Sequence, residues 1–302
     1  MRVVITGGTG FVGRNVASLL AARGDDVTVL TRDGSGKPEA RVRFGVWTPS
    51  AAGDWQRTLE DADAVVSLQG AGVMDERWTA ARVALLRKSR VDSTRLIAEA
   101  IARAPKKATL VSASAVGVYG MRMDGEILDE RGAHGQDVLA EICEAWEGAA
   151  ALAREAGARI AMARIGMVLG PGGGALAKLL PPFRAFVGGP LGAGSQWISW
   201  VHVEDVVRAI AFAIDTPTFA GPFNLTAPNP VTMNELARAV GHSLRRPARM
   251  RVPAVALRAA LGARAEAILT GQRAIPRHLL DSGFTFAFPR LDEALADILS
   301  GV

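Results

Sequence analysis

Short apolar runs alternate with amphipathic stretches along the first half of the chain. Runs rich in β-branched residues predict buried strands over 2–6, 26–31, 42–47, 61–69, 108–114 and 159–164. Apolar positions that recur with a helical period predict helices over 11–23, 78–103 and 137–156. Strands that alternate with helices form parallel sheets through right-handed crossovers. The pattern therefore predicts an α/β fold with a doubly wound parallel sheet of the Rossmann type.

After residue 165 the alternation loosens, and glycine and proline become frequent. The Gly/Pro-rich loops 170–174 and 188–196 are too long to be simple connections in a compact domain, which indicates a functional role. The elements expected here are helices at 176–186 and 205–214, strands at 200–202 and 221–225, and a helix opened by a capping box of Thr232 and Glu235. We expect a nucleotide-binding domain of residues 1–165 plus about 200–228. A smaller, discontinuous α+β substrate domain is expected from 166–199 and 229–302.

The first turn of the chain carries three glycines with the spacing G-x-x-G-x-x-G. Gly7, Gly10 and Gly13 directly follow the first strand and lead into the first helix, which is the context of a dinucleotide-binding turn. The first glycine permits a tight turn, the second admits a pyrophosphate, and the third lets helix and strand pack closely. We interpret the turn as a nucleotide site, the alternative being a purely structural turn. Its expected contact residues are Gly7, Thr9, Gly10, Phe11, Val12 and Gly13.

The residues after the second strand predict which dinucleotide binds. An acidic residue there favours NAD through the ribose hydroxyls, whereas an arginine favours NADP through the 2′-phosphate. The chain has Thr31 and Arg32 at this place, with Asp33 one position later. We therefore expect NADP, and NAD is the alternative if Asp33 turns toward the ribose. Gly70 and Ala71 follow the fourth predicted strand, and their small size lets a cofactor lie across its end.

The composition of the chain indicates its cellular compartment, but it does not indicate which reaction the protein catalyses. The chain has 302 residues, a net charge of +5, a pI of about 10 and one cysteine, Cys143. A single thiol excludes an internal disulfide and a cysteine-based zinc cluster. We expect no signal peptide, because the first apolar run stops at Thr6, and no apolar run approaches the ~18 residues of a membrane span. We expect a cytoplasmic protein without a membrane partner, and no metal site because the four histidines are far apart.

The densest basic run contains Arg245, Arg246, Arg249 and Arg251. Such a run is more often a solvated face than a site for a polyanion. No recognition motif accompanies the charge, so we expect no nucleic-acid partner.

Longer motifs resemble the extended short-chain dehydrogenase/reductase superfamily, which contains nucleotide-sugar epimerases and dehydratases. They are TGGTGFVG at 6–13, SASAVGVYG at 112–120, ARIGMVLGP at 163–171, WVHVEDV at 200–206 and GPFNL at 221–225. The segment GGPLGAGSQWISWVHVED at 188–205 and a C-terminal signature from Gly271 to Pro289 are similar to a narrower epimerase-like subfamily. The resemblance implies a nicotinamide cofactor, which we expect Ser112 and Arg164 to contact. It also implies a small-molecule substrate and, as one expectation, a homodimer.

The resemblance breaks at the catalytic residues. The superfamily uses a Tyr-x-x-x-Lys pair, an upstream Ser or Thr and usually an Asn, and this chain contains no Tyr-x-x-x-Lys. When the helix around residue 146 is matched to that of the superfamily, Leu139 stands at the tyrosine position and Cys143 at the lysine position. The asparagine falls near Arg90. Ser114, or alternatively Ser112, remains from the usual set, and we expect Ser114 to hydrogen-bond the substrate oxygen.

A substitute acid must come from elsewhere if the protein is an enzyme. Tyr119, the only tyrosine, is the first candidate, and the alternative is a loop anchor that buries its ring. Glu141 and Cys143 are further candidates on the helix that normally carries the catalytic pair. We expect His202 to be a structural histidine.

Two functions follow from this pattern. The first is an NADP-dependent oxidoreductase or epimerase-like enzyme for a small polar substrate, with Ser114 and Tyr119 as its catalytic residues. Trp197 and Trp200 either wall its substrate pocket or only pack in the core. The second is a non-catalytic protein that senses NADP(H), because superfamily members without the Tyr/Lys pair can keep the fold and lose turnover.

Overall fold

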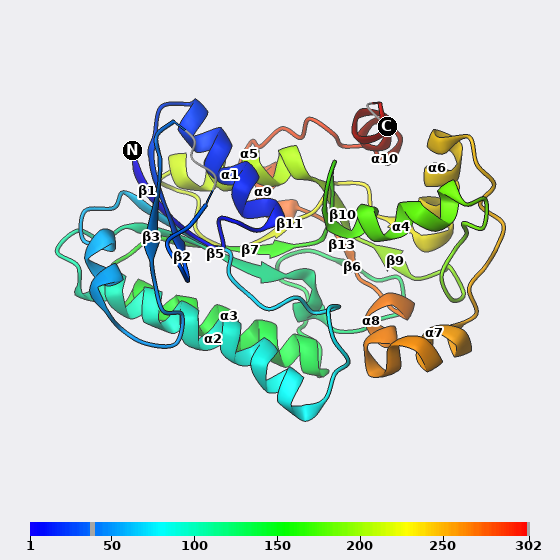
Figure 1. Ribbon diagram of the computed structural model, residues 1–302, viewed down its shortest axis with the longest axis horizontal. Helices are drawn as coiled ribbons and strands as arrows, with labels where there is room; N and C mark the ends of the chain where they lie inside the picture. The colour runs from blue at the N-terminus through cyan, green and yellow to red at the C-terminus, as the bar shows by residue number, and fades with distance from the viewer. Residues whose placement is uncertain (37–39, 301–302) are drawn as a thin grey trace.

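A parallel sheet of seven strands forms the centre of the computed structural model, which describes residues 1–36 and 40–300 (Figure 1). Its strands are β1 (Arg2–Thr6), β2 (Asp26–Thr31), β3 (Val42–Val46), β4 (Ala64–Ser67), β5 (Thr109–Ala115), β7 (Ile160–Ile165) and β11 (Gly221–Leu225). The spatial order β11-β7-β5-β4-β1-β2-β3 changes direction between β1 and β4. Open α/β sheets bind ligands at this change of direction, outside the carboxyl ends of the strands. The predicted Rossmann-type α/β fold is confirmed.

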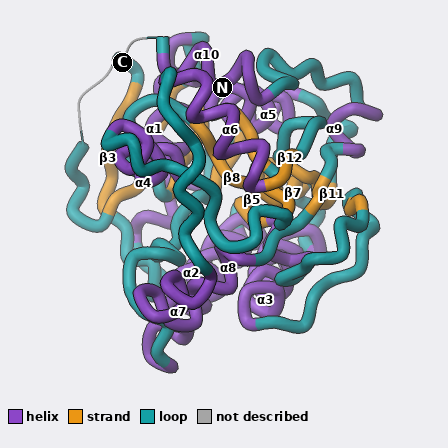
Figure 2. Tube along the Cα trace, turned by 90° about the vertical axis from the view of Figure 1, so that its right-hand side faces the viewer, coloured by secondary structure: helices purple, strands orange, loops and turns teal. Residues whose placement is uncertain are grey.

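Helices cover both faces of this sheet. In Figures 1 and 2, α1 (Phe11–Ala22) and α5 (Val203–Asp215) lie above it, and α2 (Ala80–Arg103) and α3 (Val138–Glu155) lie below it. Successive side chains of a strand point to opposite faces. In β1, Val3 and Ile5 therefore pack with α1 and α5, while Val4 packs on the α2 side. This alternation produces the continuous apolar runs from which the strands were predicted.

The boundaries of local elements agree well with the sequence pattern. β1, β2 and β11 have the predicted bounds, and Gly24, with a φ of +97°, directly follows the C-cap of α1. β4 is shorter than expected at both ends, because residues 61–63 belong to the turn and bend before it and residues 68 and 69 to the loop after it. The loop expected over 34–38 includes residues 37 and 38, which lie outside the described residues.

The second half of the chain builds a separate cluster of smaller elements beside the strand ends. These are β8 (Met167–Leu169), α4 (Gly174–Arg184), β9 (Trp197–Ile198), β10 (Trp200–His202), β12 (Val231–Thr232) and α6 (Met233–Leu244). Trp200 is fully buried among side chains of α4 and α6, together with those of α10 (Leu291–Leu299). The capping box of Thr232 and Glu235 forms as predicted.

The C-terminal segment returns to the main sheet. It contains α7 (Ala254–Leu261), η3 (Gly262–Ala265), α8 (Glu266–Leu269), β13 (Arg273–Ala274) and α9 (Arg277–Asp281). Phe284 and Phe286 join the core cluster that includes α5, and the buried carboxylate of Asp205 accepts hydrogen bonds from the N–H groups of Ala287 and Phe288. This segment thus contacts both parts of the molecule, and the division into two domains stays a prediction. Across 1–36 and 40–300, no helix is long and apolar enough to span a bilayer.

Candidate functional site

A cleft of about 790 Å³ opens where the strand order changes direction. Its wall includes seven of the residues predicted to bind a cofactor, which are Gly7, Thr9, Gly10, Thr31, Arg32, Gly70 and Ala71. The ends of β1, β2 and β4 bring these distant segments together. Asp33, the basis of the NAD alternative, also lines the cleft, and the sequence pattern gave no indication of five further wall residues, Ser35, Trp47, Pro49, Gln69 and Ser89.

The glycine turn has the backbone geometry of a phosphate cradle. Gly7 has a φ of +71°, and a Cβ on it would lie 2.7 Å from the backbone nitrogen of Gln69. A Cβ on Gly13 would lie 2.3 Å from the Gly7 carbonyl oxygen, so this glycine permits the close packing of helix and strand. Arg14 donates the first amide hydrogen bond within α1, to Gly10, and no side chain caps the helix. The Gly10 amide already donates to the Gly7 carbonyl, whereas the first-turn amides of Phe11, Val12 and Gly13 fit a bound phosphate.

Phe11 and Val12 do not line this cleft with their side chains. The Phe11 ring lies against the loop 170–174, because a Cβ on Gly173 would be 2.3 Å from it. Only the backbone amides of Phe11 and Val12 can serve the predicted contact, since they belong to the first turn of α1.

Two charged residues, Arg32 and Asp33, directly follow β2, and they differ in their hydrogen-bond partners. Asp33 accepts hydrogen bonds from the Ser35 N–H at 3.1 Å and the Thr31 hydroxyl at 3.3 Å. The hydrogen bonds from Ser35 hold the pKa of Asp33 below its usual value. Arg32 is exposed in the wall of the cleft, and within the described residues no ion pair engages it. Both residues are exposed in the wall of the cleft, and the Asp33 carboxylate already has partners within its own turn.

Helix α2 supports the opposite wall of the cleft. The Ser89 hydroxyl accepts a hydrogen bond from the Ala71 N–H at 3.0 Å, and Arg90 donates to the Ala71 carbonyl at 2.9 Å. The Arg90 guanidinium also lies over the Trp146 ring, 5.3 Å from its centroid, and burial lowers its pKa. Arg90, near the expected asparagine position, therefore fixes the loop that contains Gly70 and Ala71.

A second pocket of about 320 Å³ lies at the carboxyl ends of β5 and β7. Its wall adds the start of α3, residues 197–199 and residues 267–272. Val73 belongs to this pocket, and Ala71, two residues earlier, belongs to the cofactor cleft. The two concavities therefore adjoin through one short segment.

The wall of the second pocket shows what replaces the catalytic pair. Leu139, at the tyrosine position, lines the pocket, while Cys143 lies behind it and is only 6% exposed. Burial, together with the nearby Glu147 carboxylate, raises the pKa of the Cys143 thiol to about 12. A Cβ on Gly117 would lie 3.8 Å from both Leu139 Cβ and Cys143 Sγ. The pocket therefore has an apolar side chain, a neutral thiol and a glycine at this place, and none of them is an acid at neutral pH.

The expected role of Ser114 does not fit its position. The side chain is 3% exposed, does not line the pocket, and donates its hydroxyl hydrogen to Glu147 Oε1 at 2.7 Å. Ser112 is equally buried and donates to the Ala113 carbonyl, so it does not reach the cofactor cleft. Alternate residues of a strand share a face. Both serines consequently point under the sheet toward α3, and neither prediction is supported.

Tyr119 is a core residue and not the substitute acid. It belongs to η2 (Val116–Tyr119), is 0% exposed, and donates its hydroxyl hydrogen to Asn224 Oδ1 at 2.7 Å. Arg164 donates to the same hydroxyl at 3.0 Å and forms two 2.9 Å hydrogen bonds with the Glu147 carboxylate. Burial raises the pKa of Tyr119 to about 12. Tyr119 therefore stays protonated, and Arg164, expected at the cofactor, is used inside this buried network instead.

The remaining candidates divide between structure and pocket wall. Glu141 is exposed on α3 and does not line the pocket. His202 is the N-cap of α5, where Nδ1 accepts a hydrogen bond from the Glu204 N–H, and burial lowers its pKa. Trp200 packs in the core, whereas Trp197 lines the pocket. Of the two roles considered for these tryptophans, Trp200 therefore has the packing role and Trp197 the role in the pocket wall.

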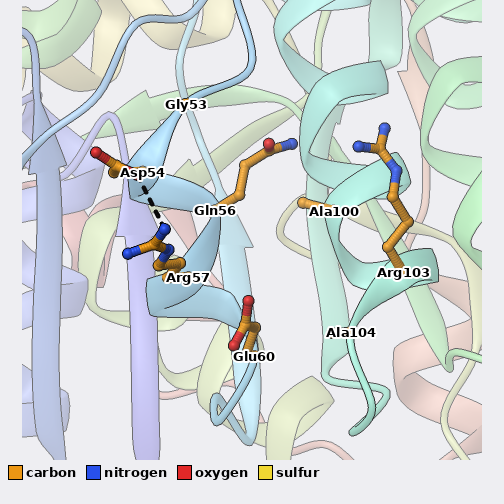
Figure 3. A pocket seen from close by; sticks show the side chains of 8 residues that line it. All are labelled: Gly53, Asp54, Gln56, Arg57, Glu60, Ala100, Arg103 and Ala104. Carbon is orange, nitrogen blue, oxygen red and sulfur yellow. Dashed lines mark ion pairs between the residues drawn. The ribbon is translucent and has the colours of Figure 1, made fainter.

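Another depression, of about 350 Å³, lies between η1 (Asp54–Leu59) and the C-terminal end of α2 (Figure 3). Its side chains are mostly exposed and polar, and Arg57 pairs with Asp54 at 3.6 Å. The elements around it lead into the amino ends of β4 and β5. Because α/β sheets bind ligands at the carboxyl ends, this depression is not the functional site.

The fold and the glycine-lined cleft define a dinucleotide-binding α/β protein, and sequence comparison specifies the class further. Residues 3–225 match the NAD dependent epimerase/dehydratase family, and the chain belongs to this family. Residues 252–298 match a domain of unknown function, DUF1731. These matches confirm the resemblance seen in the motifs and in the C-terminal signature.

Individual relatives cover nearly the whole chain. An Arabidopsis thaliana protein, "Epimerase family protein SDR39U1 homolog, chloroplastic", is 39% identical over 305 residues, which are 99% of this chain and 87% of that protein. The Mycobacterium bovis protein "Epimerase family protein Mb2239" is 40% identical over 294 residues, 97% of this chain and 96% of that protein. The crystal structure of human epimerase family protein SDR39U1 with NADPH superposes with a TM-score of 0.89, at 32% identity and 100% coverage of both chains.

Proposed function

We propose that the protein is an NADP(H)-dependent oxidoreductase whose substrate lies beside the cofactor cleft. The observation that carries the proposal is the adjacency of two concavities at the carboxyl ends of the strands, one with a phosphate cradle and one with an apolar wall. The backbone of Gly7 and Gly10 and the first amides of α1 would hold the pyrophosphate. Arg32 would pair with the 2′-phosphate. The human relative of similar structure was crystallised with NADPH, which supports this choice.

The residues of the second pocket bind and orient the substrate. The chemistry that the cofactor supplies when bound is a hydride for the carbonyl carbon of an acceptor, whose oxygen takes a proton from water to give the alcohol. Leu139 and Gly117 provide no proton at the place where the superfamily has its tyrosine. The reaction therefore depends on orientation in the pocket more than on a tuned side-chain acid.

A specific observation favours a second candidate, a protein that senses NADP(H) without turnover. The hydroxyls of Ser114 and Tyr119 and the thiol of Cys143 all point into the protein core. In this alternative, the second pocket serves to recognise the reduced or oxidised state of the cofactor.

The cofactor assignment is tested by titrating the full chain with NADPH and NADH while tryptophan fluorescence is followed. Arg32→Ala removes one charge-assisted contact, so we expect NADPH affinity to fall 10- to 100-fold and NADH affinity to change less than about twofold. Arg43→Ala is the matched control, because Arg43 is an exposed arginine on β3 outside the cleft. Equal losses for both cofactors would contradict the 2′-phosphate role.

Turnover is tested separately by following NADPH absorbance with a panel of carbonyl compounds. Oxidation of NADPH by one of them supports the oxidoreductase. Tight binding of NADPH with no oxidation across the panel supports the sensor.

A further inference from the structure

Most side chains in the wall of the second pocket are apolar. Val73, Val116, Leu139, Ile165, Met167 and Ile198 surround it from five separate segments of the chain. Glycines such as Gly117 and Gly166 complete the wall without adding polar side-chain atoms. A ligand that fills this space replaces water on apolar surface, which favours an apolar body.

Most polar side chains in the wall already have partners inside the protein. The Ser199 hydroxyl donates to the Gln272 carbonyl at 2.7 Å and accepts from the Ala274 N–H at 2.8 Å. The Thr270 hydroxyl donates to the Glu266 carbonyl at 2.6 Å, and Gln272 Nε2 donates to the Gly120 carbonyl at 2.5 Å. Among the described residues of the wall, the side-chain groups left for a ligand are few, chiefly the Trp197 indole N–H and the Gln272 amide oxygen. A substrate rich in hydroxyl groups would lose its water contacts without replacement.

The charge in the wall is negative. Asp137 is the one ionisable side chain among the described residues that line the pocket. Its carboxylate caps α3 by accepting hydrogen bonds from the Leu139 and Ala140 N–H groups, and it also accepts one from the Met121 N–H. Arg273 lies outside the lining, with its guanidinium over the Trp197 ring at 4.0 Å. An anion in this pocket would meet a carboxylate and no cationic side chain of the described wall, which is unfavourable in a site withdrawn from water.

From this wall we infer that the substrate is a small, uncharged and mainly apolar carbonyl compound, and that the pocket rejects nucleoside diphosphate sugars and carboxylates. The inference rests on the proposed oxidoreductase function and names its substrate class. It replaces the small polar substrate that the sequence led us to expect. The volume of about 320 Å³ sets the size limit.

The test is calorimetric binding to the full chain saturated with NADP⁺, after NADP⁺ binding itself has been measured. Acetophenone and benzoate are matched probes, because they share a phenyl ring and differ in charge, and UDP-glucose is the third probe. We expect acetophenone to bind at least 100-fold more tightly than benzoate, and UDP-glucose not to compete with it. Failure to bind NADP⁺ would overturn the proposed function. Failure of acetophenone to bind the NADP⁺-loaded protein would overturn only the substrate class.

A charge placed in the wall provides the second arm of the test. Leu139→Lys should weaken acetophenone binding at least tenfold and improve benzoate binding. Val138→Lys is the control, because it introduces the same charge one residue earlier, outside the pocket lining. Ala267→Lys places the charge on a different element and keeps the test valid if Leu139→Lys does not fold. The inference would be refuted if benzoate or UDP-glucose bound to the unmodified chain as tightly as acetophenone. It would also be refuted if the lysine variants bound acetophenone and benzoate with unchanged affinity.

Discussion

Replacement of Tyr119 by phenylalanine tests whether the Tyr119 hydroxyl stabilises the fold or takes part in catalysis. The substitution keeps the ring in its buried place and removes only the oxygen that joins Asn224 and Arg164. Asn224 Oδ1 then loses its donor, while Asn224 Nδ2 keeps its bonds to the Leu128 and Ile275 carbonyls. The Arg164 guanidinium keeps Glu147 and the Glu130 carbonyl.

The expected cost is that of one buried acceptor left without a donor and one weakened contact to a buried cation. Such losses amount to about 2 kcal/mol in the free energy of unfolding. For a chain of this size, that corresponds to a fall in melting temperature of roughly 4 °C. Urea unfolding and calorimetry measure the loss, and fluorescence titration should show unchanged NADPH affinity. An unaltered melting temperature together with lost turnover would refute the structural role of Tyr119.

The pH dependence of stability provides an independent check. The pKa of Tyr119 is about 12 in the folded protein and near 10 when unfolded. Because the folded-state pKa is raised, the stabilisation is fully present below pH 10 and is lost as the pH rises toward 12. Tyr119→Phe should therefore lose less stability than the unmodified chain between pH 10 and 12. The comparison between the two proteins matters, since the Cys143 thiol also titrates in this range.

Two further predictions concern the glycine turn and the single thiol. Gly13→Ala should abolish NADPH binding and lower stability, because its Cβ would lie 2.3 Å from the Gly7 carbonyl oxygen. Gly148→Ala is the control, since a Cβ there meets nothing within 4 Å. Identical behaviour of the two variants would contradict the packing role of Gly13. Cys143, with a pKa of about 12, should react with iodoacetamide at pH 8 about a thousand times more slowly than a thiol of pKa 9, and faster as the pH rises. Rapid alkylation of the folded protein, followed by mass spectrometry, would show that the thiol is accessible after all.

The sequence was informative where structure is decided locally. The bounds of β1 and β2 could be predicted because charged or glycine residues flank each apolar run. Gly7 and Gly13 could be interpreted because a strand and a helix adjoin them in the sequence. The capping box of Thr232 and Glu235 likewise needs only neighbours within one turn.

Interactions between distant segments could not be predicted in this way. The buried role of Tyr119 could not be predicted, because its hydrogen-bond partner Asn224 lies 105 residues later in the chain. Without that partner, its hydroxyl was a candidate for the acid. Ser114 and Ser112 could be assigned to one face of their strand, but which helix covers that face depends on the complete sheet. The pocket wall combines Val73 with Ala267, and nothing in either sequence neighbourhood indicates that the two meet.

The C-terminal segment also determines when the main core can be completed during synthesis. Phe212 on α5 meets Phe284 with ring centroids 5.6 Å apart, and Phe286 joins the same cluster. Because these residues come well after α5 in the chain, the side of α5 that contains Phe212 stays uncovered until the segment around Phe284 has been synthesised. A chain truncated before Phe284 would therefore lose part of its central core and two anchors of Asp205, and not merely a tail.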